Sequence, residues 1–215
     1  SPDISEQDLI SCLAAGSSCD GGFVSEAAEA LKSQGVVSEK CFPYQAENVA
    51  CLRCANWRRV LSKIRVWRWI TTDRADTGAV RTALQDGPVV SHMEVYDDFY
   101  SYRNGIYART SGASYEGGHA VLIVGYDDGD NCWICKNSWG TGWGENGYFK
   151  IRRGNCSIGT YVLQVSGVTI NNRPPELSGI GSQTTKEGVD ITIQLSGQDA
   201  DGDFIITWQS EVPST

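Results

Sequence analysis

The distribution of cysteines constrains this chain more than any other feature of its sequence. The 215 residues contain eight cysteines, all within the first 156 positions. Two Cys-x-x-Cys pairs occur, at 51–54 and 132–135. They lie much farther apart than the two halves of a zinc ribbon, and the second pair lies inside an aromatic strand-like run, not where a strand enters a helix. The pattern therefore favours disulfide bonds over zinc or redox catalysis, which predicts a secreted protein.

Composition excludes several other classes of protein. The net charge is -8, so acidic residues outnumber the Lys and Arg that could neutralise the phosphates of a nucleic acid. We therefore expect no nucleic-acid partner. No apolar run approaches the roughly 20 residues that cross a bilayer, and the first residues lack the basic and apolar regions of a signal peptide. We expect no membrane span and no cofactor.

Periodicity predicts helices in the first part of the chain and mostly strands after it. Ser5 is typical of a helix N-cap, with Asp8 as its capping-box partner, and a second helix through FVSEAAEALKSQ is expected to stop at Gly35. A Cys-rich loop over 41–57 separates these helices from the segments that follow. We expect a strand at 64–70, a short helix at 77–85, and strands at 88–95, 119–126, 131–138 and 147–153. This order indicates an α+β fold.

Composition changes again near residue 170. The stretch 170–177 contains a Pro pair typical of a domain boundary, and two alternating strands without cysteine follow. We expect a domain over 1–168, a linker over 169–175 and a partial β unit over 176–215. Asp199, Asp201 and Asp203 in its turn are weak calcium candidates, and a solvated hairpin explains them equally well.

Two histidines, His92 and His119, are available for acid–base chemistry. A histidine in a strand is more often structural, and His92 fits that interpretation. His119 follows two glycines, which leave room for a ligand, and Asn137 lies on what reads as a neighbouring strand. An asparagine carbonyl that accepts the proton of one ring nitrogen fixes the tautomer and aims the other nitrogen at a nucleophile.

Five motifs occur in the order and at the spacing of a known family: SEQDLISC, CDGGF, CFPY, GGHAVLIVGY and KNSWGTGWGENGYFKI. In them, residues 1 to about 168 resemble the papain-like cysteine peptidases, and the last motif is the most specific. The resemblance implies a papain-like two-lobed fold, in which residues 1 to about 85 would supply most of a helical left lobe and residues 86 to 168 most of a β-barrel-like right lobe. The partial unit after them resembles the opening of a cadherin-like or immunoglobulin-like repeat.

The same resemblance implies a role for each residue of the active site. His119 would be the base, Asn137 would orient it, Trp139 would shield their hydrogen bond, and Trp143 would line the leaving-group side of the cleft. The chemistry agrees, because an imidazolium beside a thiol lowers the thiol's pKa and yields a thiolate that attacks an amide carbonyl.

The nucleophile itself is missing. In this family it lies about 130 to 150 residues before the histidine, which falls upstream of Ser1. The chain is then either a fragment of a longer polypeptide or a peptidase that has lost catalysis. We favour the fragment because His119, Asn137 and Trp139 are retained together, and we expect the chain alone to be inactive, with the missing N-terminal segment of the same polypeptide as its partner.

The resemblance also places the peptide substrate. Gly21 and Gly22 would pair with an extended peptide through main-chain hydrogen bonds, although a turn also explains them. An apolar, rather shallow pocket with Tyr161 at its floor would hold the second side chain before the scissile bond. Its residues would be Phe23, Val24, His92, Gly117, Gly118 and Tyr161. No carboxylate occurs among them, so a strong preference for arginine is not expected.

The disulfides follow partly from the resemblance. Cys12 with Cys51 matches a bridge of the family, and Cys19 should pair with a cysteine in the missing segment. Cys41 with Cys54 is plausible by proximity, and Cys135 with Cys156 could join adjacent strands, which leaves Cys132 over. The resulting hypothesis is a secreted cysteine-type endopeptidase acting on peptides or proteins. The alternative is a noncatalytic peptide-binding or adhesive module that keeps the cleft.

Overall fold

The computed structural model describes residues 3–13 and 18–170, and beyond them only the backbone of four short strands. The helical segments are α1 (Glu6–Asp8), the π-helix η1 (Leu9–Leu13), α2 (Val24–Ser33), the 3-10 helices η2 (Trp57–Arg59) and η3 (Asp97–Ser101), and α3 (Thr77–Ala83). The strands up to residue 170 are β1 (Ser62–Lys63), β2 (Val66–Trp69), β3 (Val89–Tyr96), β4 (Ile106–Tyr107), β5 (Tyr115–Asp127), β6 (Cys132–Lys136), β7 (Tyr148–Arg152), β8 (Leu163–Ser166) and β9 (Thr169–Ile170). The expected order of helices and strands is therefore confirmed, and α2 ends before Gly35, whose φ is +82°.

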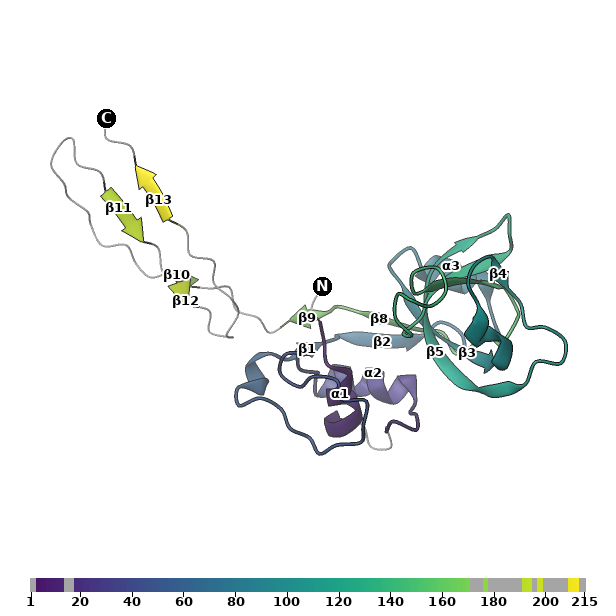
Figure 1. Ribbon diagram of the computed structural model, residues 1–215, viewed down its shortest axis with the longest axis horizontal. Coiled ribbons are helices and arrows are strands. Elements are labelled where there is room, and N and C mark those ends of the chain that lie inside the picture. Colours follow the sequence, from purple (N-terminus) through teal and green to yellow (C-terminus); the bar gives the residue numbers. More distant parts are fainter. Residues whose placement is uncertain are drawn as a thin grey trace.

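Seven strands form one sheet in the order β2-β8-β3-β5-β6-β7-β4, antiparallel except for the β4–β7 pair. Figure 1 shows α3 with β3, β4 and β5 in one lobe and α1, α2 and β1 in the other, with β2 and β8 running between them. We call these the sheet lobe and the helical lobe. The mixed architecture is the α+β fold expected from the sequence.

The boundary between the lobes differs from the expected one near residue 85. Val80 and Ala83 of α3 are buried in the same core as Met93 and Ile123 of the sheet, so α3 belongs to the sheet lobe. Strand β2 extends the sheet by pairing with β8 over four residues, while its Trp67 and Trp69 pack in the core that contains Ala28 of α2. The prediction was wrong here because a short amphipathic helix does not indicate which core its apolar face will join.

The helical lobe has a small core and a polar centre. Ser5 caps α1 by accepting a hydrogen bond from the backbone N–H of Asp8, as expected. Asp8, however, does not complete a capping box: its carboxylate binds the guanidinium of Arg53 at 2.5 and 3.1 Å and accepts from the backbone N–H of Val37 at 3.1 Å. The Asp8 side chain is fully buried, so this ion pair joins the first helix to the cysteine-rich loop away from water.

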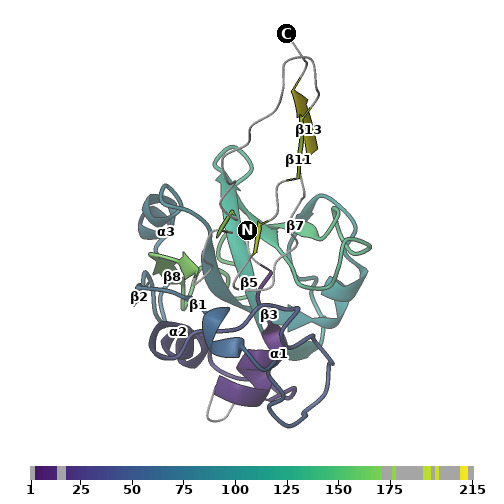
Figure 2. The same ribbon diagram turned by 90° about the vertical axis from the view of Figure 1, so that its left-hand side faces the viewer.

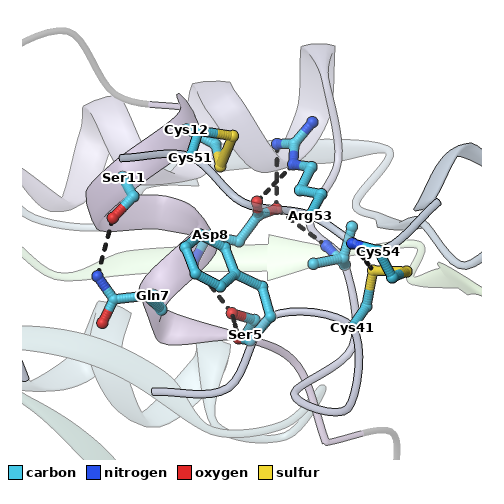
Figure 3. The surroundings of a disulfide bond; sticks show 11 residues. Ser5, Gln7, Asp8, Ser11, Cys12, Cys41, Cys51, Arg53 and Cys54 are labelled. Carbon is cyan, nitrogen blue, oxygen red and sulfur yellow. Dashed lines mark hydrogen bonds and ion pairs between the residues drawn. A yellow bond between two sulfur atoms is a disulfide. The ribbon is translucent and has the colours of Figure 1, made fainter. Parts of the chain in front are cut away.

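Two disulfides flank this ion pair (Figure 3). Cys12 is bonded to Cys51, and Cys41 to Cys54. Both pairs are those expected from the sequence. They close loops of 39 and 13 residues, and so reduce the conformational freedom of an unfolded segment that has little apolar core to hold it.

The expected Cys135–Cys156 disulfide is absent, and both residues are free thiols, as are Cys19 and Cys132. Cys135 lies within β6 opposite Phe149 of β7, with its side chain in the sheet core. Cys156 lies beyond the end of β7, in a left-handed conformation with φ +48°, and its sulfur contacts Asn155 instead. The pairing was wrong because strand adjacency does not bring a residue in the following turn opposite the middle of a strand.

Alkylation of the folded 215-residue chain is expected to modify Cys19 and to spare Cys132, Cys135 and Cys156. Cys19 is exposed, whereas burial raises the pKa of the other three thiols and keeps them protonated and inaccessible. Mass spectrometry after iodoacetamide treatment would measure this. Unfolding without reductant should then expose all three. A 135–156 pair that stayed unlabelled after unfolding would contradict the structure.

The end of the chain is described only in part. Thr169 and Ile170, expected to begin the linker, instead form β9 and pair with β1 of the helical lobe. Farther on, β10 (Glu176–Leu177) pairs with β12 (Gly197–Gln198), and β11 (Ile191–Gln194) with β13 (Gln209–Val212). The rest of the expected linker and the calcium candidates Asp199, Asp201 and Asp203 lie outside the described residues. Within the described part, no helix is long and apolar enough to cross a membrane.

Candidate active site

The central strands of the sheet bring His119 and Asn137 together. His119 lies in β5, opposite Met93 of β3, and Asn137 directly follows the last residue of β6, which pairs with Leu122 of β5. The apolar alternation of HAVLIVGY buries one face of β5 against the core, which fixes the register of the strand. Two residues 18 positions apart in the sequence therefore become neighbours.

Asn137 holds the imidazole of His119 through one hydrogen bond. Nε2 of His119 lies 2.9 Å from Oδ1 of Asn137. The same Oδ1 also accepts a bond from the backbone N–H of Ser138 at 2.8 Å, and this second donor identifies the atom as the amide oxygen. Nε2 must therefore carry the proton, which leaves Nδ1 as the basic nitrogen.

Trp139 covers this pair. Its ring stacks on the imidazole of His119 with centroids 5.3 Å apart and an interplanar angle of 28°. The indole ring of Trp139 also stacks with the Tyr100 ring, with centroids 5.3 Å apart, and contacts the rings of Phe99 and Trp143 edge to face. Asn137 is 7% exposed, so its bond to His119 lies in a largely dry environment where a hydrogen bond is strengthened.

Trp143 supports Trp139 and exposes little surface of its own. It is 8% exposed, packs against Phe99 and Phe149, and donates from its indole nitrogen to the carbonyl of Tyr100 at 3.1 Å. The structure thus places it behind Trp139, in an aromatic cluster centred on the fully buried Phe99.

A pocket of about 610 Å³ opens beside His119, between the two lobes. Its lining residues are Gly22, Phe23, Val24, Ser25, Trp69, His92, Gly118, His119, Ala120 and Tyr161. Side chains from the start of α2 form one wall, and β3, β5 and Tyr161 form the other. Figure 2 shows α2 next to β1, β2 and β8, the strands that connect the lobes.

Five of the six residues expected around this pocket line it, and Gly117 does not. Gly21 lines a smaller adjoining hollow, and its backbone N–H and C=O are already bonded to Ser18 in a turn. Gly21 is therefore not available to pair with an extended peptide, and the turn interpretation holds at that residue. Gly22 remains at the rim of the main pocket.

Two backbone features shape the pocket. A Cβ atom at Gly118 would lie 3.1 Å from Cε1 of His92, so a glycine there gives the His92 ring its space. Tyr161 has a left-handed backbone with φ +46°, a strained conformation for a bulky residue. It is held by its N–H bond to the carbonyl of Thr72 at 2.7 Å.

Sequence reasoning missed Ser25, Trp69 and Ala120 in the lining. Ser25 and Ala120 directly follow residues that were predicted, so proximity was a usable signal. No such signal was available for Trp69, because it lies at the pocket only as a result of the pairing of β2 with β8, in which it lies opposite Leu163. Its indole contacts the Tyr161 ring edge to face, with centroids 6.1 Å apart.

None of the eight cysteines lines the pocket with His119. Four are disulfide-bonded, three are buried, and Cys19 is exposed outside the pocket. Within the described residues, the group of His, Cys, Asp and Glu atoms close enough to hold a metal is Asp8 with Cys12 and Cys51. Those two sulfurs form a disulfide, and both oxygens of Asp8 bind Arg53, so this cluster is unsuited to a metal.

Comparison with known proteins gives one consistent result. Residues 1–166 match the family described as papain family cysteine protease. Cathepsin B-like CP3 of Giardia intestinalis is 34% identical to this chain, and the match covers 74% of this chain and 56% of that protein. Cathepsin B-like protease 1 of Arabidopsis thaliana is 33% identical, and the match covers 77% of this chain and 49% of that protein. A procathepsin L2 from the larval midgut of Tenebrio molitor superposes with a TM-score of 0.67 at 30% identity, over 77% of this chain and 54% of that one. The chain thus spans about half the length of the curated relatives it matches.

Proposed function

Because this chain belongs to the papain family of cysteine proteases, we propose that it forms the larger part of a cysteine-type endopeptidase that cleaves peptide bonds in the cleft beside His119. The observation that carries the proposal is the bond of 2.9 Å between His119 and Asn137 under the ring of Trp139. A structural histidine needs no such arrangement of a fixed tautomer, a covered hydrogen bond and a basic nitrogen beside a pocket.

In this proposal the nucleophile is a cysteine thiol supplied by a segment of the same polypeptide that is not among these 215 residues. Since no cysteine of the chain lines the pocket, a thiol from elsewhere has to approach Nδ1 of His119. His119 takes the thiol proton, and the ion pair that results keeps the sulfur as a thiolate at neutral pH.

Catalysis would proceed in two steps. The thiolate attacks the carbonyl carbon of the substrate, and as the tetrahedral intermediate collapses the C–N bond breaks and the His119 imidazolium protonates the departing amine. His119 then takes a proton from water, which attacks the thioester and releases the acid. Asn137 keeps the imidazole in one orientation through both steps, and Trp139 keeps water from their bond. The donors that stabilise the oxyanion would come from the segment that carries the thiol.

The pocket beside His119 would bind the second side chain before the cleaved bond, and Gly22 would pair with the peptide backbone. The two disulfides support folding in an oxidising compartment, so we propose a secreted protein. The partners of this site would be peptides or unfolded protein segments.

The test compares the complete polypeptide, with its upstream segment, to the 215-residue chain. The complete protein is expected to hydrolyse a fluorogenic peptide amide and to be inactivated by an epoxide reagent that alkylates cysteine thiolates, while the 215-residue chain shows no turnover. Peptide binding without turnover by the complete protein would instead indicate a noncatalytic module. Thiol-dependent turnover by the 215-residue chain alone would refute the assignment of the nucleophile.

A further inference from the structure

We propose that His92 makes the pocket between the lobes selective for glutamate and glutamine side chains, with glutamate favoured over glutamine as the imidazole becomes protonated. This inference deepens the proposed function and rests on it in one respect, that the pocket receives a side chain of a bound peptide. It concerns which side chain is held there, and it does not depend on cleavage.

His92 lines the pocket and carries a polar ring. It lies on β3 opposite Ala120 of β5, half-buried, with its ring above Gly118. Tyr161 holds the ring edge to face, with centroids 6.3 Å apart and an interplanar angle of 88°. Neither ring nitrogen of His92 has a hydrogen-bond partner among the described residues. A donor that lines a pocket and has no partner in the protein is free to bind a ligand oxygen.

The rest of the lining favours the same assignment. Phe23, Val24, Trp69 and Ala120 offer apolar surface suited to the methylene groups of a side chain, and no carboxylate lines the pocket. A glutamate or glutamine has two methylenes followed by an oxygen-bearing group, so its stem would contact the apolar wall while its oxygen meets the imidazole. A lysine or arginine would find no anionic partner there.

The charged groups around His92 leave it without an anionic partner of its own. On the same face of β3, Glu94 is engaged with the Tyr96 hydroxyl at 3.1 Å. From β5 the titratable neighbour in the pocket is His119, and from the loop before β8 it is Tyr161. An imidazolium at His92 would therefore pair with a substrate carboxylate in preference to an internal one.

The charged side chains farther from His92 near β3 also have hydrogen-bond partners of their own. Asp98 of η3 accepts from the Tyr107 hydroxyl at 2.6 Å and from Thr110. Arg68 of β2 donates to the side-chain oxygen of Gln164 on β8. These contacts hold both charged side chains in bonds to other residues of the sheet lobe.

The pH dependence follows from the chemistry of imidazole. A protonated imidazolium can form a charge-assisted hydrogen bond with a glutamate, whereas glutamine is bound about equally by the neutral and the protonated ring. Because the site is half-exposed, solvent screens the pair, and we expect the preference for glutamate over glutamine to rise by about fivefold from neutral to acidic pH.

The experiment uses three peptides that differ only at the second residue before the cleaved bond, which is glutamate, glutamine or methionine. For the complete protein, kcat/KM for each peptide is measured at about pH 5.5 and at about pH 7.5. Dissociation constants of fluorescently labelled versions are measured by anisotropy under the same conditions. The comparison of the glutamine and methionine peptides measures the effect of a hydrogen bond to His92. The comparison of the glutamate and glutamine peptides measures the effect of the charge on the substrate.

Two variants identify the residue responsible. His92→Gln keeps a polar side chain that cannot be charged, and is expected to abolish the pH dependence of the glutamate-to-glutamine ratio. Tyr161→Phe removes the hydroxyl of the ring that contacts His92 edge to face, and is expected to retain that dependence. A wild-type ratio that does not change with pH, or an equal change in His92→Gln, would overturn the proposal. Binding that shows the predicted ratios without cleavage would refute the endopeptidase and leave this inference standing. If methionine peptides are cleaved but the glutamate-to-glutamine ratio does not change with pH, the endopeptidase stands and this inference is refuted. If no peptide binds, both proposals are refuted.

Discussion

Replacing His119 with alanine in the complete protein is expected to lower kcat/KM for a peptide substrate by about a thousandfold, because acid–base catalysis by a positioned imidazole contributes on this scale. His119 would both generate the thiolate and protonate the leaving amine, so its loss affects more than one step. The loss should appear mainly in kcat, since His119 forms only one part of a pocket lined by ten residues. Steady-state kinetics on purified enzyme would measure it.

Asn137→Ala is the companion variant that separates orientation from chemistry. It leaves the imidazole in place and removes the acceptor at 2.9 Å, so we expect a smaller loss in kcat, on the order of 10- to 100-fold. Asn137→Asp keeps an acceptor oxygen and should recover part of that loss. If His119→Ala retained more than a tenth of the wild-type kcat, this imidazole would not be the catalytic base.

Replacing Arg53 with methionine is expected to destabilise the fold by about 3 kcal/mol, because the Asp8 carboxyl group would remain buried without its partner. The side chain of Asp8 is 0% exposed and that of Arg53 12%, so water cannot easily replace the guanidinium. In a domain of this size such a loss corresponds to a fall in Tm of about 10 °C. Thermal unfolding followed by circular dichroism would measure it.

Two controls identify the cause of that destabilisation. Arg59→Met removes an exposed arginine of η2 and should change the free energy of unfolding by less than about 0.5 kcal/mol. Asp8→Asn in the Arg53→Met background removes the unpaired charge but keeps an acceptor for the Val37 N–H, and should restore most of the lost stability. If Arg53→Met were no less stable than Arg59→Met, the buried ion pair would have no structural importance.

The parts of this protein that could be predicted from its sequence are those in which neighbouring residues carry the signal. Ser5 capping α1 and the stop of α2 before Gly35 follow from local backbone chemistry. His119 lies on the first strand of a β-hairpin and Asn137 directly follows the second, so the two residues were expected to lie near each other. The Cys12–Cys51 bond was implied by the resemblance to the papain-like peptidases, and the Cys41–Cys54 bond by the proximity of its cysteines in the sequence.

Long-range packing determined the rest. Asp8 looked like a capping residue, but its partner is Arg53, 45 positions away. Likewise, Cys135 and Cys156 appeared close enough to bond until the sheet placed one thiol in a strand core and the other in a left-handed turn.

The sequence by itself determined the order of helices and strands through its periodicity and turn residues, and its resemblance to the papain-like peptidases implied the two lobes and the roles of His119, Asn137 and Trp139. Only the tertiary structure decided which lobe α3 joins and which side chains surround the pocket. Trp69 and Tyr161 meet there because β2 pairs with β8, whose residues lie nearly a hundred positions away, and the alternation within a strand does not specify its partner.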